Sequence, residues 1–132
     1  MVHATTVTRA DCETRSANRR SGTLLYLLSH LVFGVRHPRQ PTLGVEFAGE
    51  VVQVGSAVTE FTVGDHVFGE TAFFRFGAWA EYICVAQDGR MATLPAGLTF
   101  EQAAPICDGA LNALGCFQMA ASLQGKRVLV YG

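Results

Sequence analysis

The chain contains four cysteines and four histidines, and their spacing limits the chemistry that these residues can perform. Neither a C-x-x-C pair nor the paired Cys/His spacing of a zinc site occurs among Cys12, Cys84, Cys107 and Cys116. No catalytic set can be recognised among His3, His30, His37 and His66, and the sequence has no G-x-S-x-G elbow. We therefore expect reduced thiols, as in a cytosolic protein, and look for chemistry in other side chains.

Two acidic side chains stand where the pattern predicts that helices begin. Asp11 follows a β-prone stretch, and a carboxylate there can cap a helix, pair with Arg9 or take part in chemistry. Asp108 can cap the helix that follows it or act as an acid in a cleft. Asn112 lies one turn later, inside the predicted helix. Asparagine is mildly unfavourable in the interior of a helix, which weakens a purely structural explanation for this residue.

Two helices are predicted near the C-terminal end. Thr99 followed by Gln102 is a capping-box pattern, which predicts a helix over residues 100–106 that Pro105 should kink. A second helix is expected over residues 109–121, with a buried stripe formed by Leu111, Leu114 and Phe117.

Most of the remaining sequence predicts β-structure. Runs rich in β-branched and aromatic residues predict strands over residues 2–8, 47–54, 61–68, 76–85, 91–94 and 127–132. Gly49 indicates a bend of the kind that small barrels use at their corners. The clearest strand is the one over residues 76–85, and because both its faces should be covered, Glu81 is expected to be buried with a partner.

Length and composition predict one globular domain. The chain has 132 residues, 49% of them hydrophobic, and a net charge of -1, which argues against nucleic-acid and anionic-membrane partners. Leucines at helical spacing predict a short core-covering helix over residues 24–31, or alternatively a pocket rim or partner surface. The apolar run over residues 24–34 is too short to span a membrane and contains Ser29 and His30.

Several motifs in fixed order carry a family resemblance. They are G-x-E-x-A-G-x-V from Gly44, V-G from Val54, F-x-V-G-D-x-V-F-G from Phe61, and the later runs GAWAEYICV, LPAGLTFEQAA and GKRVLVYG. Together they resemble the catalytic domain of the medium-chain dehydrogenase/reductase superfamily. The resemblance implies a mainly β fold, a GroES-like partly open barrel with C-terminal helices and the first strand of an absent nucleotide-binding domain. It also implies that two N-terminal strands are missing, and it places the domains at residues 1–124 and 125–132.

The positions that bind catalytic zinc in some members of this superfamily are changed here. They correspond to Thr8, Val45 and Asp108, and threonine and valine cannot replace a thiolate and an imidazole. We therefore expect no bound metal. What remains is similar to the zinc-independent branch of quinone-oxidoreductase-like and enoyl-reductase-like enzymes.

The resemblance also assigns candidate site residues. Thr8 would donate a hydrogen bond near the developing enolate oxygen, and Asp11 would orient a hydroxyl group or the nicotinamide ribose. Asn112 would hold a ribose hydroxyl or the carboxamide of the cofactor, with Asp108 beside it. The loop over residues 70–77 would border the substrate cleft, or cap the barrel end or contact the missing domain, through Phe73, Phe74 and Phe76.

The implied function is that of a substrate-side domain from a cytoplasmic, NADP-dependent, zinc-independent oxidoreductase. Its substrates would be small enones, quinones or other carbonyls. The chain alone should be inactive and bind no NADP, because it has no Gly-rich dinucleotide turn. Alternatives are an alcohol dehydrogenase relative that lost its metal site, or a non-catalytic binding or adaptor domain. Unpaired strand edges also predict a homo-oligomer formed by strand addition or swapping.

Overall fold

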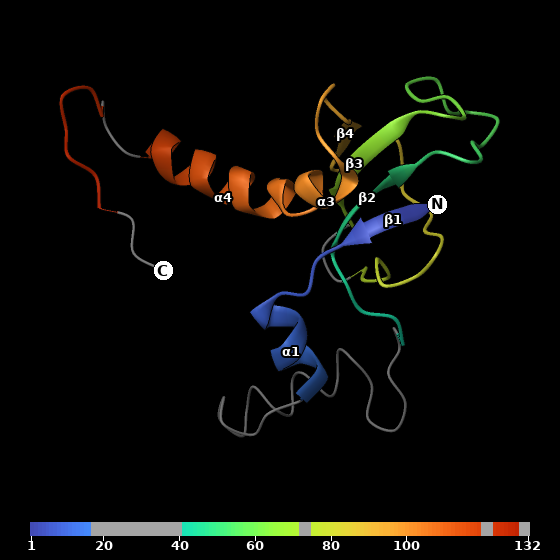
Figure 1. Cartoon of the computed structure of the whole chain (residues 1–132), viewed down its shortest axis with the longest axis horizontal. Helices are drawn as coiled ribbons and strands as arrows, with labels where there is room; N and C mark the ends of the chain where they lie inside the picture. The colour runs from blue at the N-terminus through green and yellow to red at the C-terminus, as the bar shows by residue number, and fades with distance from the viewer. Residues whose placement is uncertain (17–40, 72–74, 120–122, 130–132) are drawn as a thin grey trace.

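The structure is a computed structural model that describes residues 1–16, 41–71, 75–119 and 123–129. Its centre is an antiparallel sheet with the strand order β1-β2-β3-β4 (Figure 1). The strands are β1 (Val2–Thr5), β2 (Glu46–Glu50), β3 (His66–Glu70) and β4 (Met91–Thr93). Within the described residues the sheet does not close on itself, and the predicted mainly β, partly open architecture is confirmed.

Three helices accompany the sheet in the described part of the chain: α1 (Arg9–Ser16), α3 (Phe100–Ala103) and α4 (Ile106–Met119). The first follows β1 directly, and the other two follow β4 (Figure 1). The helix expected over residues 24–31, as well as Phe73 and Phe74, lies outside the described residues. No helix among the described residues is long and apolar enough to cross a bilayer.

The two faces of the sheet carry different cores. Strands β2 and β3 pair from Glu46 opposite Glu70 to Glu50 opposite His66, and directly opposite residues share a face. One face holds an apolar cluster of Phe47, Phe61, Val67 and Ala78. The other face packs Ala48 against Ala103 and Ala104 at the end of α3. Because Glu46 and Glu70 alternate with Phe47 and Gly69, their side chains belong to the helix-covered face.

The predicted capping box is present at α3. The Gln102 amide donates to Thr99 Oγ1 over 3.3 Å, and the Thr99 amide donates to Gln102 Oε1 over 3.0 Å. Helix α3 ends at Ala103 and α4 begins at Ile106, so Pro105 lies in the break between them. The capping signal is local, and the structure confirms it.

The strand predicted over residues 76–85 is wrong as a regular strand, because the structure shows no strand there. The Val2 amide bonds the Glu81 carbonyl over 2.8 Å, but no continuous ladder forms along the segment. Glu81 is exposed rather than buried, so the expectation of a buried partner for it is also wrong. The strands predicted over residues 47–54 and 61–68 are shifted to Glu46–Glu50 and His66–Glu70.

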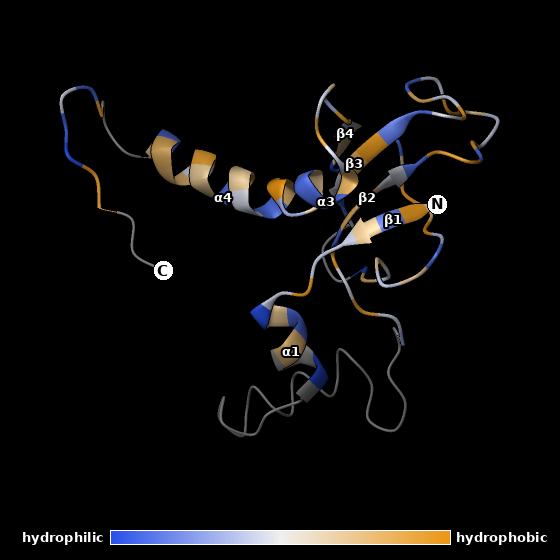
Figure 2. Ribbon diagram, viewed as in Figure 1, coloured by the Kyte–Doolittle hydropathy of each residue, from blue (hydrophilic) through white to orange (hydrophobic). Residues whose placement is uncertain are grey.

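The predicted buried stripe on the last helix is wrong as well. Helix α4 extends away from the sheet, and Figure 2 shows apolar residues recurring along it (Figures 1 and 2). Leu111, Leu114 and Phe117 are 47%, 52% and 48% exposed. The stripe exists in the sequence, but no described element covers it. Residues 127–129 of the last predicted strand are likewise irregular, and residues 130–132 lie outside the described part.

Candidate functional site

Thr8 and Asp11 form a second capping box, at the start of α1. Asp11 Oδ2 accepts hydrogen bonds from the Thr8 amide over 2.9 Å and from the Thr8 hydroxyl over 2.8 Å. In return, the Asp11 amide donates to Thr8 Oγ1 over 3.3 Å. Asp11 is only 2% exposed. The sequence left three roles open for Asp11, and the structure shows the geometry of the helix-capping one.

This geometry constrains what the Thr8 hydroxyl can do. Its proton is directed to Asp11, and one of its lone pairs receives the Asp11 amide. Hydroxyl groups rotate readily, so the Thr8 proton can turn to a substrate oxygen. The bond from the Thr8 amide to the Asp11 carboxylate then holds the cap. Thr8 is half-buried, which leaves part of its side chain accessible.

Asp108 and Asn112 form a pair on the exposed surface of α4. The Asn112 Nδ2 group donates to Asp108 Oδ1 over 2.8 Å. Because the helix begins at Ile106, Asp108 lies within its first turn and is not its cap, so the predicted helix start is wrong by a few residues. A carboxylate in the first turn is favoured by the helix dipole. The pair leaves Asn112 Oδ1 and one Asp108 oxygen as acceptors for a ligand hydroxyl.

Glu46, for which the sequence predicted no role, joins these two regions. Its side chain is 4% exposed. Oε2 accepts from the Thr6 hydroxyl over 2.6 Å, and Oε1 accepts from the Asp108 amide over 3.0 Å. One buried carboxylate thus ties the segment leading to the Thr8–Asp11 cap to the first turn of α4. The signal available in the sequence was an acidic residue inside an apolar β-prone run.

A second buried carboxylate lies opposite Glu46 on the neighbouring strand. Glu70 is 4% exposed and pairs with Arg90, whose side chain is 67% exposed. The hydrogen bond and charge of Glu70 raise the pKa of Arg90 above its ordinary value. Two carboxylates facing each other across a strand pair repel, and Arg90 together with the α4 amide offsets that repulsion.

Cys107 lies beside these carboxylates at the start of α4. Burial raises the pKa of its thiol, and the negative charges of Glu70 and Glu46 raise it further. A raised pKa keeps the group as an unreactive thiol near neutral pH. We predict that iodoacetamide at pH 8 alkylates Cys107 more slowly than the exposed Cys84 and Cys116, as followed by peptide mass spectrometry. Preferential alkylation of Cys107 would contradict this environment.

The remaining predicted site residues are placed less completely. Phe76 is half-buried, while Phe73 and Phe74 lie outside the described residues. Near Phe76, the Trp79 indole donates to the Thr6 carbonyl over 2.8 Å, which connects the loop after β3 to the same Thr6–Glu46 junction. The structure therefore brings the neighbourhood of Phe76 to the segment that leads to Thr8.

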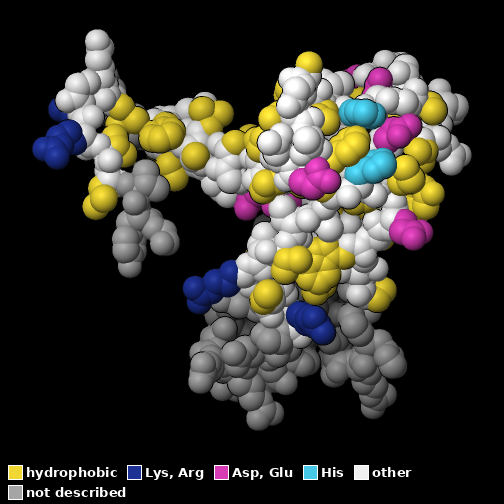
Figure 3. Space-filling model, viewed as in Figure 1, with side chains coloured by type: hydrophobic (Ala, Val, Ile, Leu, Met, Phe, Trp, Pro, Cys, Tyr) yellow, Lys and Arg dark blue, Asp and Glu magenta, His cyan; other side chains and the backbone are white. Residues whose placement is uncertain are grey.

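Two histidines contact the aromatic ring of Phe100 in α3. His3 lies parallel to Phe100 at 4.5 Å between ring centroids, and His66 is tilted against it at 4.9 Å. Figure 3 shows both described histidines on one face of the molecule. His66 is exposed at the start of β3. In the described part of the chain, no group of three or more potential ligand side chains is arranged to hold a metal.

Comparison with known proteins gives consistent matches. The family described as "Alcohol dehydrogenase GroES-like domain" matches residues 1–96. A mycocerosic acid synthase-like polyketide synthase of Mycobacterium tuberculosis is 41% identical over 95 residues, which cover 70% of this chain and 4% of that protein. A quinone oxidoreductase of Pseudomonas aeruginosa is 37% identical over 89 residues, covering 67% of this chain and 26% of that protein.

The fold has a solved counterpart. The structure of the quinone oxidoreductase from Coxiella burnetii superposes with a TM-score of 0.70 and 31% sequence identity, covering 90% of this chain and 34% of that one. The chain therefore spans a small part of the proteins that it matches.

Proposed function

Because the chain belongs to the alcohol dehydrogenase GroES-like family, in its quinone-oxidoreductase-like branch, we propose that it is the substrate-side domain of a larger oxidoreductase. Residues 1–124 form this domain, and residues 125–132 lead into a nucleotide-binding domain. The enzyme reduces small quinones, enones or related carbonyls with a nicotinamide cofactor in the cytoplasm.

The observation that carries this proposal is the junction at Glu46. Its two carboxylate oxygens join the Thr6 hydroxyl to the Asp108 amide, so the two segments holding the proposed site residues meet at one buried group. A reduction site needs a hydrogen-bond donor and a cofactor contact side by side, and this junction brings the two segments together.

Thr8 is the proposed donor. When a carbonyl substrate is present, the Thr8 hydroxyl turns from Asp11 and donates to the oxygen on which negative charge develops. Asp11 then retains its bond to the Thr8 amide and keeps the cap in place, which makes it a positioning residue. The three phenylalanines Phe73, Phe74 and Phe76 supply an apolar wall for a flat substrate.

The residues on α4 fit the sugar portion of the cofactor. The reduced cofactor NADPH would supply a hydride when bound. Asn112 Oδ1 and the second carboxylate oxygen of Asp108 accept hydrogen bonds from ribose hydroxyls. The Asp108 carboxylate repels phosphate, so the phosphate groups of the cofactor bind to the nucleotide-binding domain. The exposed apolar stripe of α4 contacts that same domain.

The residues at the zinc-type positions do not fit a metal. Thr8 donates to Asp11, Val45 has no ligand atom, and Asp108 is held by Asn112. No step of the proposed reaction is routed through a metal, and an alcohol dehydrogenase relative with a lost metal site remains the nearest alternative.

The resemblance to enoyl-reductase-like enzymes adds a second substrate class within the same chemistry, namely an α,β-unsaturated acyl group, and the chain is also similar to a polyketide synthase. Its reduction needs the same hydride supply and the same donor at the carbonyl oxygen. Quinones and unsaturated thioesters therefore belong in one substrate panel.

The direct test mixes the 132-residue chain with NADPH and this panel and follows NADPH absorbance. We expect no turnover above background, because both domains are required. Turnover by the chain alone would refute the two-domain proposal. A homo-oligomer formed through open strand edges is the associated proposal, and sedimentation at tens of micromolar distinguishes it from a monomer.

A further inference from the structure

The segment that leads to Thr8 is short and is little held by packing. Thr6, Val7 and Thr8 join the end of β1 to the start of α1. The Val7 side chain is 71% exposed, and Figure 1 shows α1 set apart from the sheet. Among the described strands and helices, none makes an extended contact with α1. Hydrogen bonds at Thr6 therefore have a large share in setting the direction in which the chain leaves β1.

Thr6 is held through two different groups. Its hydroxyl donates to Glu46 Oε2 over 2.6 Å, and its carbonyl accepts from the Trp79 indole over 2.8 Å. A side chain can turn about its own bonds, so the Glu46 bond does not fix the orientation of the next peptide group. The Trp79 bond acts on that peptide group itself, which is planar and includes the nitrogen of Val7.

Only the two backbone torsions of Val7 separate this peptide group from the next one. The next peptide group carries the Thr8 amide, which donates to Asp11 Oδ2 over 2.9 Å in the cap of α1. Trp79 thus orients one plane and the cap orients the other. The influence of Trp79 reaches the Thr8 donor through a path of two residues that has few freely rotating bonds.

Trp79 is itself fixed in place. Its amide donates to the Leu43 carbonyl over 3.0 Å, and the Ala78 amide donates to the Gly44 carbonyl over 3.2 Å. A Cβ at Gly44 would collide with the indole ring, so the ring lies directly against this backbone. A residue that is anchored in this way can fix the position of the Thr6 carbonyl.

Resting on the proposed function, we propose that Trp79 is a positioning residue for the reduction. Its indole N–H holds the Thr6 carbonyl and thereby keeps the Thr8 hydroxyl where the carbonyl oxygen of the substrate binds. In this role Trp79 acts through Thr8 and contacts neither substrate nor cofactor. The alternative is a packing role, in which the half-buried indole N–H only needs some acceptor.

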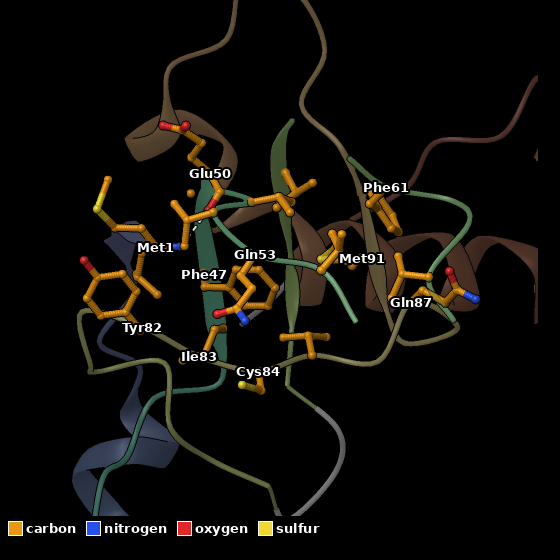
Figure 4. A pocket seen from close by; sticks show the side chains of 18 of the residues that line it. Met1, Phe47, Glu50, Gln53, Phe61, Tyr82, Ile83, Cys84, Gln87 and Met91 are labelled. Atoms are coloured by element: carbon orange, nitrogen blue, oxygen red, sulfur yellow. Dashed lines mark hydrogen bonds between the residues drawn. The ribbon is translucent and has the colours of Figure 1, made fainter. Parts of the chain in front are cut away.

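Two substitutions separate these roles. Trp79→Phe keeps an aromatic ring but removes the donor, whereas Trp79→His keeps a ring N–H at the corresponding place and loses apolar surface. A packing role predicts that Trp79→His is the more damaging change, and a positioning role predicts that Trp79→Phe is. Tyr82→Phe is the matched control, because Tyr82 lines the pocket of about 450 Å³ on the sheet face opposite α3 and Trp79 does not (Figure 4).

The first measurement uses the 132-residue chain and does not depend on activity. Residual dipolar couplings of backbone amides report the orientation of α1 relative to β2 and β3. We expect the α1 couplings of Trp79→Phe to depart from the alignment that fits the sheet, and those of Trp79→His and Tyr82→Phe to fit it. Unchanged couplings in Trp79→Phe, or a larger change in a folded Trp79→His, would overturn the proposal. If Trp79→His does not fold, Trp79→Phe and the control decide the outcome.

The second measurement is quinone reduction by a chimera that carries residues 1–124 in place of the matching segment of the quinone oxidoreductase from Coxiella burnetii. Because a small misplacement of a reacting group slows the chemical step, Trp79→Phe should lower kcat by about tenfold to a hundredfold and leave the KM for NADPH unchanged. Trp79→His should recover most of this loss. In an active chimera, an unchanged kcat in Trp79→Phe would overturn the proposal. An unsubstituted chimera that reduces no quinone would count against the proposed function instead, and the couplings would still decide whether Trp79 orients α1.

Discussion

The substitution Gly44→Ala is expected to destabilise the chain by about 2–5 kcal/mol. Gly44 has a φ of +88°, where residues with a Cβ atom are strained. A Cβ at this position would also collide with the indole ring and the backbone nitrogen of Trp79. Trp79 cannot withdraw without losing its bond to the Thr6 carbonyl, so both costs act together.

Gly64 provides the matched control for this prediction. Its φ is +95°, but a Cβ there would meet no atom within 4 Å. Gly64→Ala should therefore cost only the backbone term, about 1–2 kcal/mol. Urea unfolding of both variants separates conformational strain from collision. Equal losses at Gly44 and Gly64 would show that the Trp79 contact does not constrain the fold.

The second large effect is expected at Glu46. Glu46→Leu fills similar space but leaves the Thr6 hydroxyl and the Asp108 amide without their acceptor, which should cost about 2–4 kcal/mol. Glu46→Gln retains an oxygen for Asp108 and an amide group for the Thr6 oxygen. It also removes the repulsion from Glu70, so its cost should stay below about 1 kcal/mol.

Thr6→Val tests how the energy at this junction is divided. It removes only one of the two Glu46 bonds and should cost about 1 kcal/mol. In the variant that combines Glu46→Leu with Thr6→Val, the loss should be smaller than the sum of the separate losses, because the two residues share a bond. Additive losses in urea unfolding would contradict the bridging role assigned to Glu46.

Local signals in the sequence were more dependable than signals that need a partner. The capping box at Thr99 and Gln102 involves residues of one turn, and it formed as predicted. The strand expected over residues 76–85 needed a neighbouring ladder, and the helical stripe at Leu111 needed a covering surface. An amino-acid pattern shows which face of an element can be buried, but not whether another element is there to bury it.

At the candidate site too, the local feature was predictable from the sequence and the long-range contact was not. A helix cap was one of the roles predicted for Asp11, because capping depends on neighbours in the sequence, and Asp11 caps α1 together with Thr8. The bond from Glu46 to Asp108 connects residues far apart in the chain, and no pattern within either segment reveals it. Glu81 was predicted to be the buried acid with a partner, but Glu81 is exposed and Glu46 is the buried one.

The most direct test of the central claim is the activity of a chimera. Residues 1–124 of this chain replace the matching segment of the quinone oxidoreductase from Coxiella burnetii, and NADPH-dependent quinone reduction is measured with and without a metal chelator. We predict reduction within about a hundredfold of the parent rate, a margin that allows for small misplacement at the new domain contact, with no effect of the chelator. A folded chimera that binds NADPH but reduces no quinone, or one that loses activity on chelation and regains it with zinc, would contradict the account.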